Sequence, residues 1–141
     1  MPEESTTPDL VELGRRSIEA GASGDLDAMV SYFAPDGVWD LSPVGLGIFE
    51  GRAAIRSFAE DWLGAYEESE TKVEEIHDLG NGVAYAVIAL NARPVGSSGY
   101  VELRYAAVTI WGADALAERT TNYTNIDEAR AAAERLAEQR G

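Results

Sequence analysis

Four strand-like segments follow one another in the second half of this 141-residue chain, with only short turns between them. They cover residues 72–79, 83–93, 100–111 and 115–125. Because such short connections join neighbouring strands of opposite direction, the segments predict an antiparallel meander. The longer strands would span roughly 36–40 Å at about 3.3 Å per residue, so they must bend. The chain is therefore constrained to a curved sheet whose concave side helices can fill.

Helical patterns precede this sheet. Residues 8–22 place apolar and small side chains on one stripe at helical spacing, after Thr7-Pro8, a typical helix start. Residues 25–33 form a second short amphipathic pattern, with the first of them as N-cap. Pro35-Asp36-Gly37 then predicts a turn, and residues 38–41 predict a short strand.

Two further helices complete the pattern. The third begins near Gly51 and carries an aromatic stripe that reaches Tyr66, followed by a solvated acidic end at residues 67–70. Asn81-Gly82 predicts a type I′ hairpin between the first two long strands. The last helix is predicted to start with Asp127 as its N-cap. We therefore expect an α+β fold, with a curved antiparallel sheet wrapped around N-terminal helices and a C-terminal helix.

Length and charge limit the class of protein. The chain suits one core, so we expect one domain over residues 8–141 after a flexible tail at residues 1–7. The net charge of −14 argues against nucleic acid and against anionic membranes as partners. The start of the chain is no signal peptide, and the longest apolar run, residues 83–90, is too short to span a bilayer. These features predict a cytoplasmic protein.

The chain has no cysteine, which excludes disulfides, thiolate nucleophiles and Cys-based metal sites. His77 is the only histidine, so neither a transition-metal site nor another cofactor is expected. Residues 83–90 are apolar on both strand faces, which indicates that both faces of the sheet are covered. Since the helices can cover only one face, a second copy of the chain is the simplest cover for the other. We therefore expect a homodimer through the sheet.

Several stretches of the chain resemble one superfamily. They are residues 22–34, Val38-Trp39-Asp40, residues 49–58 and residues 123–129. On these residues the chain resembles the NTF2-like superfamily, the SnoaL-like and ketosteroid-isomerase-like α+β cone. The resemblance implies a pocket for a small apolar molecule between sheet and helices. It leaves the activity open, because the superfamily includes isomerases, dehydratases, epoxide hydrolases, polyketide cyclases and non-catalytic binders.

Asp40 is the candidate for acid–base chemistry, because the order of the elements puts its carboxylate where it faces that pocket. In ketosteroid-isomerase-like members the general base is an Asp on this strand. Apolar walls raise the pKa of a carboxyl group, and the matching reaction is proton abstraction next to a carbonyl. The alternative is an Asp that binds a loop amide or an arginine. The isomerase's oxyanion donors have no counterpart here, since their positions fall near Arg16 and at Ala106 or Ala107.

Other side chains are candidates for the same pocket. Arg104 and Arg119 can clamp a substrate carboxylate or pair with carboxylates such as Asp40. Tyr85 and Tyr123 can donate hydrogen bonds. The expected walls of the pocket, with plain core as the alternative, are Trp39, Phe58, Trp62, Tyr85, Tyr105, Trp111 and Tyr123.

Three functions remain open. The first is an isomerase, cyclase or dehydratase acting on a small apolar carbonyl or cyclic compound, with Asp40 as base and with Arg104, Tyr85 or Tyr123 as orienting donors. The second is a dimeric module that binds a hydrophobic ligand or a partner without catalysis. The third is a dimeric scaffold whose core holds no usable cavity.

Overall fold

The computed structural model describes residues 9–141 and shows four α-helices, one 3₁₀ turn and six strands in that part of the chain. In chain order they are α1 (Leu10–Ala22), α2 (Leu26–Ser31), β1 (Phe33–Asp40), η1 (Ser42–Val44), β2 (Ile48–Glu50), α3 (Arg52–Gly64), β3 (Tyr66–Gly80), β4 (Val83–Pro94), β5 (Val101–Trp111), β6 (Ala117–Tyr123) and α4 (Ile126–Arg140). No helix within this range has the length and apolar character needed to cross a membrane.

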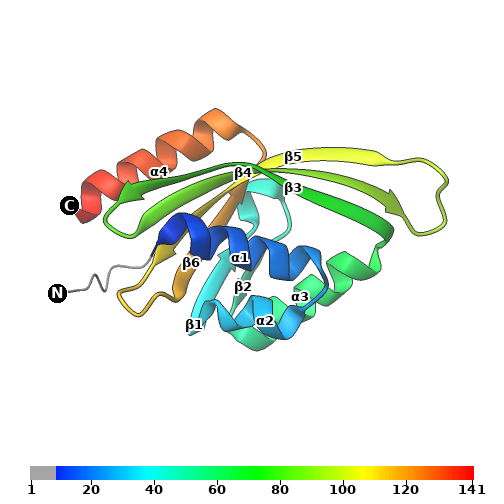
Figure 1. Ribbon diagram of the computed structural model, residues 1–141, viewed down its shortest axis with the longest axis horizontal. Coiled ribbons are helices and arrows are strands. Elements are labelled where there is room, and N and C mark those ends of the chain that lie inside the picture. Colours follow the sequence, from blue (N-terminus) through cyan, green and yellow to red (C-terminus); the bar gives the residue numbers. More distant parts are fainter. Residues whose placement is uncertain (1–8) are drawn as a thin grey trace.

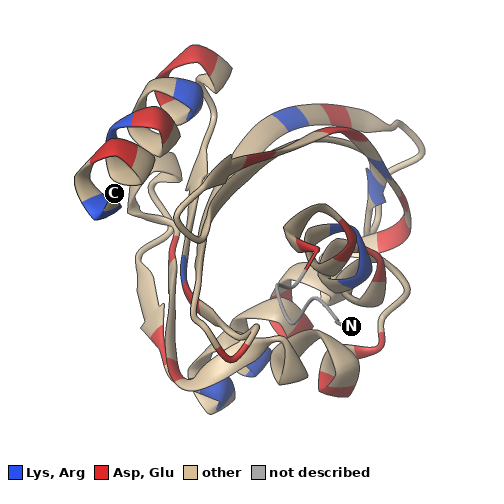
Figure 2. Cartoon of the chain, turned by 60° about the vertical axis from the view of Figure 1, so that its left-hand side comes forward, with Lys and Arg blue, Asp and Glu red and all other residues tan. Residues whose placement is uncertain are grey.

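The strands form one curved sheet in the order β2-β1-β6-β5-β4-β3. All neighbours are antiparallel except β1 and β6, which run parallel. The sheet curls around α1, and α4 lies outside the curl (Figure 1, Figure 2). This arrangement confirms the predicted α+β fold with a curved meander wrapped around the N-terminal helices.

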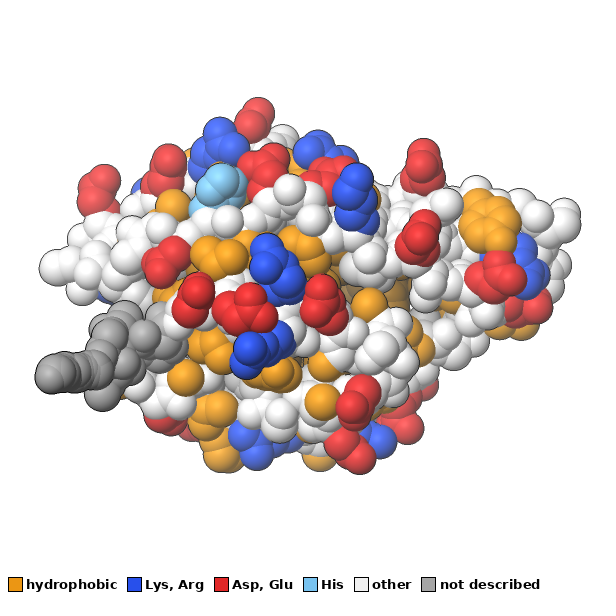
Figure 3. Space-filling view, in the orientation of Figure 1, with side chains coloured by type: hydrophobic (Ala, Val, Ile, Leu, Met, Phe, Trp, Pro, Cys, Tyr) orange, Lys and Arg blue, Asp and Glu red, His pale blue; other side chains and the backbone are white. Residues whose placement is uncertain are grey.

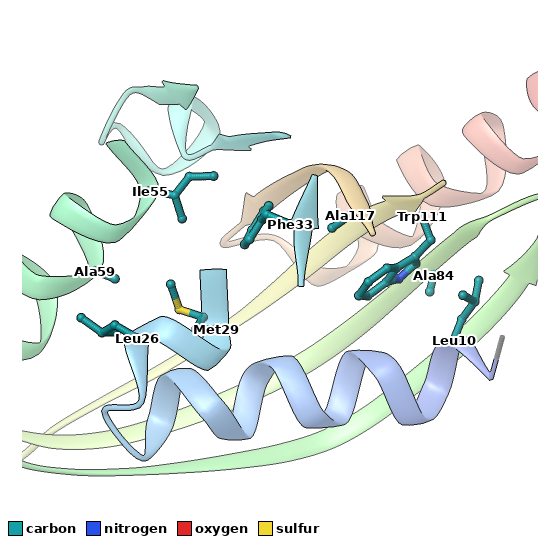
Figure 4. Packing of buried hydrophobic residues seen from close by; sticks show 9 residues of the cluster. All are labelled: Leu10, Leu26, Met29, Phe33, Ile55, Ala59, Ala84, Trp111 and Ala117. Carbon is teal, nitrogen blue, oxygen red and sulfur yellow. The ribbon is translucent and has the colours of Figure 1, made fainter. Parts of the chain in front are cut away.

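The concave side of the sheet holds the larger apolar core. Its buried members come from all three N-terminal helices and from four strands, as Figure 4 shows. They are Leu10, Leu26, Met29, Phe33, Ile55, Ala59, Ala84, Trp111 and Ala117. These side chains leave a space between the helical layer and the sheet unfilled.

The convex side has its own apolar core beneath α4. Small residues of α4, namely Ala129, Ala133 and Ala137, pack on Val83 and Val87 of β4 and on neighbouring β5 side chains. Short side chains allow the helix axis to approach the sheet closely. α4 thus covers the second face of the sheet at the start of β4, where the sequence suggested that a second copy of the chain was needed. The homodimer through the sheet stays a prediction.

Two elements in the first half differ from the expected pattern. α2 ends at Ser31, and Phe33 already belongs to β1, which extends the predicted short strand towards the N-terminus. Pro35-Asp36-Gly37 therefore lies within β1 instead of in a free turn, at the point where the register with β6 shifts. The turn-forming residues make a local irregularity in β1 and do not end the strand. The strand continues because β6 supplies backbone partners both before and after these residues.

The end of α3 was also predicted wrongly. The helix ends at Gly64, and Tyr66 with the acidic residues after it begins β3. Here β3 pairs with the end of β4, and Arg93 lies 3.3 Å from Glu67 and 3.8 Å from Glu68. Cross-strand pairing and this cation override the helical spacing of the segment.

The N-cap residue predicted from the sequence is confirmed for α2 but not for α4. Asp25 caps α2, since its side chain accepts a hydrogen bond from the amide of Ala28. α4 is capped by Asn125, which accepts from the amide of Glu128 at 3.0 Å, and not by Asp127. The proposed start at Thr7-Pro8 lies outside the described residues.

The hairpin between β3 and β4 confirms the Asn81-Gly82 prediction, with φ angles of 57° and 80° at the two residues. A Cβ atom on Gly82 would lie 2.6 Å from the carbonyl oxygen of Trp111. We predict that Gly82→Ala lowers the free energy of unfolding by about 1–3 kcal/mol or more, because it adds a clash to a left-handed backbone. Urea denaturation measures this loss.

Gly80→Ala is the matched control. Gly80 also has a positive φ, of 87°, but no atom lies within 4 Å of an added Cβ. It should cost less than the change at Gly82, and equal losses would show that the contact with Trp111 contributes nothing.

Candidate functional site

A cavity of about 390 Å³ lies between the helical layer and the concave face of the sheet. Its floor is formed by inward-facing residues of β4 and β5, and α1 and α3 close it from the other side. Among the lining residues are the aliphatic side chains of Ile18, Leu63, Ile76, Ile88 and Leu90. The volume is that of a small-molecule site.

One wall of this concave cavity is a chain of aromatic rings from β1, α3 and the start of β3. Trp39 packs edge-on against Phe58 with centroids 5.4 Å apart, and Phe58 stacks on Trp62 at 6.2 Å. Phe33 and Tyr66 extend the chain at its two ends, and Phe49 packs on Phe58 in its middle. Rings in mutual contact keep their orientation, so the aromatic wall is fixed.

Next to this wall, β6 and the residue after it carry polar groups into the concave cavity. Thr120, Asn122 and Thr124 line it from alternate positions of the chain. The hydroxyl of Thr120 lies 3.0 Å from that of Thr109, and Asn122 accepts a hydrogen bond from the indole N–H of Trp39 at 3.1 Å. Asn122 is only 8% exposed, so this is a buried polar contact within an otherwise apolar site.

No carboxylate or imidazole from the described part of the chain lines the concave cavity. Tyr105 does line it, and burial raises the pKa of its phenol to about 12. The phenol therefore stays neutral at physiological pH. Arg104 borders the cavity, but its guanidinium donates to Glu74 of β3 at 2.6 Å on the other face of the sheet.

A second cavity, of about 340 Å³, lies on the convex side between the sheet and α4. Asp40, Arg119 and Tyr123 line it together with Arg135 of α4. These side chains leave the sheet on the face opposite to Trp39 and Asn122, because neighbouring residues of a strand point to opposite faces. The sequence expectation that Asp40 faces the aromatic pocket therefore differs from the structure.

The carboxylate of Asp40 is fully engaged in its convex location. It accepts hydrogen bonds from the amide of Ser42 at 2.9 Å, from the hydroxyl of Ser42 at 2.6 Å, and from the guanidinium of Arg119. Burial alone would raise its pKa, but the two Ser42 donors and Arg119 outweigh that effect and hold the pKa of Asp40 below its ordinary value. A carboxylate with a lowered pKa is a weak proton acceptor at neutral pH.

The residues singled out in the sequence thus divide between two cavities. Trp39, Phe58, Trp62, Tyr105 and Trp111 line the concave one, whereas Asp40, Arg119 and Tyr123 line the convex one. Tyr85 borders the concave cavity, but its hydroxyl accepts from Arg130 of α4 at 2.8 Å and its ring stacks on His77. The structure does not bring Asp40 together with Arg104, which lies against β3.

Sequence reasoning missed the polar residues of β6. Asn122 lies in a run of Thr, Asn and Tyr that carries no family motif. The available signal was parity alone, since Thr120 and Asn122 alternate with Arg119, Thr121 and Tyr123. That parity could be assigned to a face only once the pairing of β6 with β1 was known.

A curved sheet closed by helices over an apolar cavity defines the NTF2-like class of fold. Within that class, a model of the SnoaL-like domain family matches residues 15–119, and the chain belongs to this family. No functionally curated protein matches the sequence.

Solved structures support the same fold. One is a protein of ketosteroid-isomerase-like fold from Catenulispora acidiphila, in complex with trimethylamine. It is 14% identical with a TM-score of 0.72, covering 91% of this chain and 94% of that one. Another, from Mycobacterium tuberculosis and in complex with estradiol-17beta-hemisuccinate, is 18% identical with a TM-score of 0.70, covering 86% and 97%. The epoxide hydrolase/cyclase-like enzyme SalBIII is 18% identical with a TM-score of 0.69, covering 79% and 87%.

The environment of Asp40 predicts a pH-dependent contribution to stability. A carboxyl whose pKa is lowered by folding stabilises the protein above its unfolded-state pKa, about 3.9, and loses this effect as the pH falls through the folded value. Asp40→Asn should therefore cost about 1–3 kcal/mol at pH 7, and the difference from wild type should shrink below about pH 4. Urea unfolding at pH 7 and at pH 3 measures both values.

Asp36→Asn serves as the control, since Asp36 is an exposed carboxylate on the same strand. It should change stability little at either pH. A cost at Asp40 that is the same at both pH values would contradict the role given to its charge.

Proposed function

We propose that this protein binds a small, uncharged, largely apolar ring compound in the concave cavity. The observation that carries the proposal is the lining itself, a fixed aromatic wall facing an aliphatic floor with a few buried polar groups between them. Such a site gains free energy by removing the ligand's apolar surface from water, and the rings favour a flat ligand. The ligand of the mycobacterial relative, a steroid hemisuccinate, has a largely apolar ring system of this kind and in addition a charged carboxylate.

Charge supports a neutral ligand. The protein carries a net charge of −14, and acidic side chains are spread among basic ones on the face that Figure 3 shows. The guanidinium nearest the concave cavity, Arg104, is held by Glu74. An anion would thus enter without a partner against the overall field, and a cation would find no carboxylate in the lining.

Acid–base catalysis with Asp40 as base is the alternative. It would have to take place in the convex cavity, with Arg119 and Tyr123 as neighbouring groups. Against it stand the three hydrogen bonds to the carboxylate and its lowered pKa. The resemblance to the cyclase-like enzyme rests on fold alone, so we favour binding over catalysis at this carboxylate.

A homodimer remains part of the proposal, although α4 covers the start of β4. Exposed apolar side chains gather at the far end of the meander, where β4 and β5 project beyond the helices (Figure 1). They are Val95, Tyr100, Val101 and Leu103. Sedimentation at micromolar concentration should give a dimer, and a monomer would remove this part of the proposal.

The binding proposal is tested by filling the cavity. Ala107 of β5 lines the concave side and is only partly buried, so a larger side chain there occupies the space of a ligand. We predict that Ala107→Trp weakens binding of Nile red, a neutral dye that fluoresces in apolar surroundings, by about tenfold or more. Fluorescence titration measures the two dissociation constants.

Ala89→Trp provides the matched control, because Ala89 pairs with Arg104 and points to the convex face. It should bind the dye like the wild type. Equal weakening by both variants, or a wild type that does not bind any neutral ring compound, would contradict the proposed function.

A further inference from the structure

One polar side chain of the concave cavity is oriented by its own neighbour. Asn122 is buried, and its side-chain oxygen Oδ1 accepts a hydrogen bond from Trp39 Nε1. An indole N–H is only a donor, so the amide cannot take the flipped orientation at this contact. The nitrogen Nδ2 must therefore point away from Trp39.

The amide nitrogen has two N–H groups to place. Within residues 9–141, no side chain or backbone oxygen accepts a hydrogen bond from Nδ2 of Asn122. Buried donors are almost always paired with protein, water or ligand, because an unpaired one costs free energy. Asn122 lines the concave cavity, so a ligand there can supply the missing acceptor.

We propose that Asn122 is the specificity residue of the concave cavity, and that it donates a hydrogen bond to an acceptor oxygen on the neutral ring compound. The ligand class is then a ring ketone, ester or ether, and a hydrocarbon of the same shape binds less well. This inference rests on the proposed function and adds the chemical group that the site requires.

The surroundings of Asn122 favour an oxygen acceptor over other polar groups. Its own acceptor, Oδ1, is already used by Trp39, so a ligand N–H or O–H has less to gain there. Asn122 pairs with Ala107, and Tyr105 lies two residues further along β5 on the same face. The neutral phenol of Tyr105 is a second hydrogen-bond donor at this end of the cavity.

The test compares two ligands that differ only in the acceptor. 9-Fluorenone and fluorene share one flat ring system, and the ketone adds one carbonyl oxygen. The wild type should bind 9-fluorenone about five- to tenfold more tightly than fluorene, the value of one neutral hydrogen bond. Asn122→Leu should bind both equally, with its affinity for fluorene unchanged or slightly higher. Quenching of tryptophan fluorescence reports both, because Trp39, Trp62 and Trp111 line the cavity.

The outcomes separate this inference from the proposed function. Equal binding of the two compounds by the wild type overturns the role of Asn122 and leaves the binding proposal standing. Failure of the wild type to bind either compound overturns both. A preference for 9-fluorenone that survives in Asn122→Leu assigns the donor elsewhere and overturns the inference.

A second measurement needs no variant and covers the case in which Asn122→Leu does not fold. The infrared carbonyl stretch of 9-fluorenone bound to the wild type should move to lower wavenumber than in an alkane solvent, because a hydrogen bond weakens the C=O bond. An unshifted band would overturn the inference.

Discussion

The alternation of side chains along β1 and β6 decides what each cavity of this protein contains. The two strands run side by side in parallel, with Trp39 opposite Thr120 and Asp40 opposite Thr121. One step along either strand moves a side chain from the concave face to the convex face. The hydrogen bond from Trp39 to Asn122 and the ion pair from Arg119 to Asp40 form on opposite faces of the same two strands. Both contacts require the same register of β1 against β6. If β1 slipped by one residue, Trp39 would move to the convex face and Asp40 to the concave face.

The two cavities differ in chemistry because different elements close them. α1 and α3 close the concave side with aliphatic and aromatic side chains, and no carboxylate from residues 9–141 lines it. α4 closes the convex side with alanines over the apolar start of β4, and places Arg130 and Arg135 at its margins. Charged groups near this margin remain partly solvated, so an Asp with an Arg partner is tolerated there at little cost. The same pair in the concave cavity would lose its water without further hydrogen bonds to replace it.

Sequence reasoning predicted the elements of the fold because their signals are local. The hairpin at Asn81-Gly82, the cap at Asp25 and the long bent strands each depend on residues within a few positions of one another. The start of β3 escaped prediction because Tyr66 and the acids after it have helical spacing. Their partners on β4, above all Arg93, lie more than 20 residues away. The aromatic wall was found for the same local reason, since Phe58 and Trp62 lie on one face of one helix.

The face of Asp40 could not be predicted in that way. The sequence shows which residues of a strand share a face, but not which face of the sheet that is. Only a contact with a residue distant in the sequence decides it. The register of β1 against β6 shifts between Phe33 and Val38, so counting from the start of the strand does not give the face of residue 40. The superfamily resemblance placed an Asp on the correct strand, but a role is carried by surroundings and not by strand position. Here Ser42 and Arg119 provide those surroundings, and their hydrogen bonds hold the pKa of Asp40 below its ordinary value.

In a cavity lined mainly by apolar side chains, the choice between ligands depends on the few polar atoms of the lining. Apolar contact rewards any ligand of suitable size, so an aromatic wall and an aliphatic floor discriminate weakly between compounds of similar shape. A buried donor discriminates more strongly, because a ligand without an acceptor leaves that donor unpaired. Trp39 serves both purposes, as a ring in the wall and as the donor that holds the amide of Asn122. One of the residues that make the cavity apolar thus also fixes the orientation of Asn122, a buried polar group in the lining.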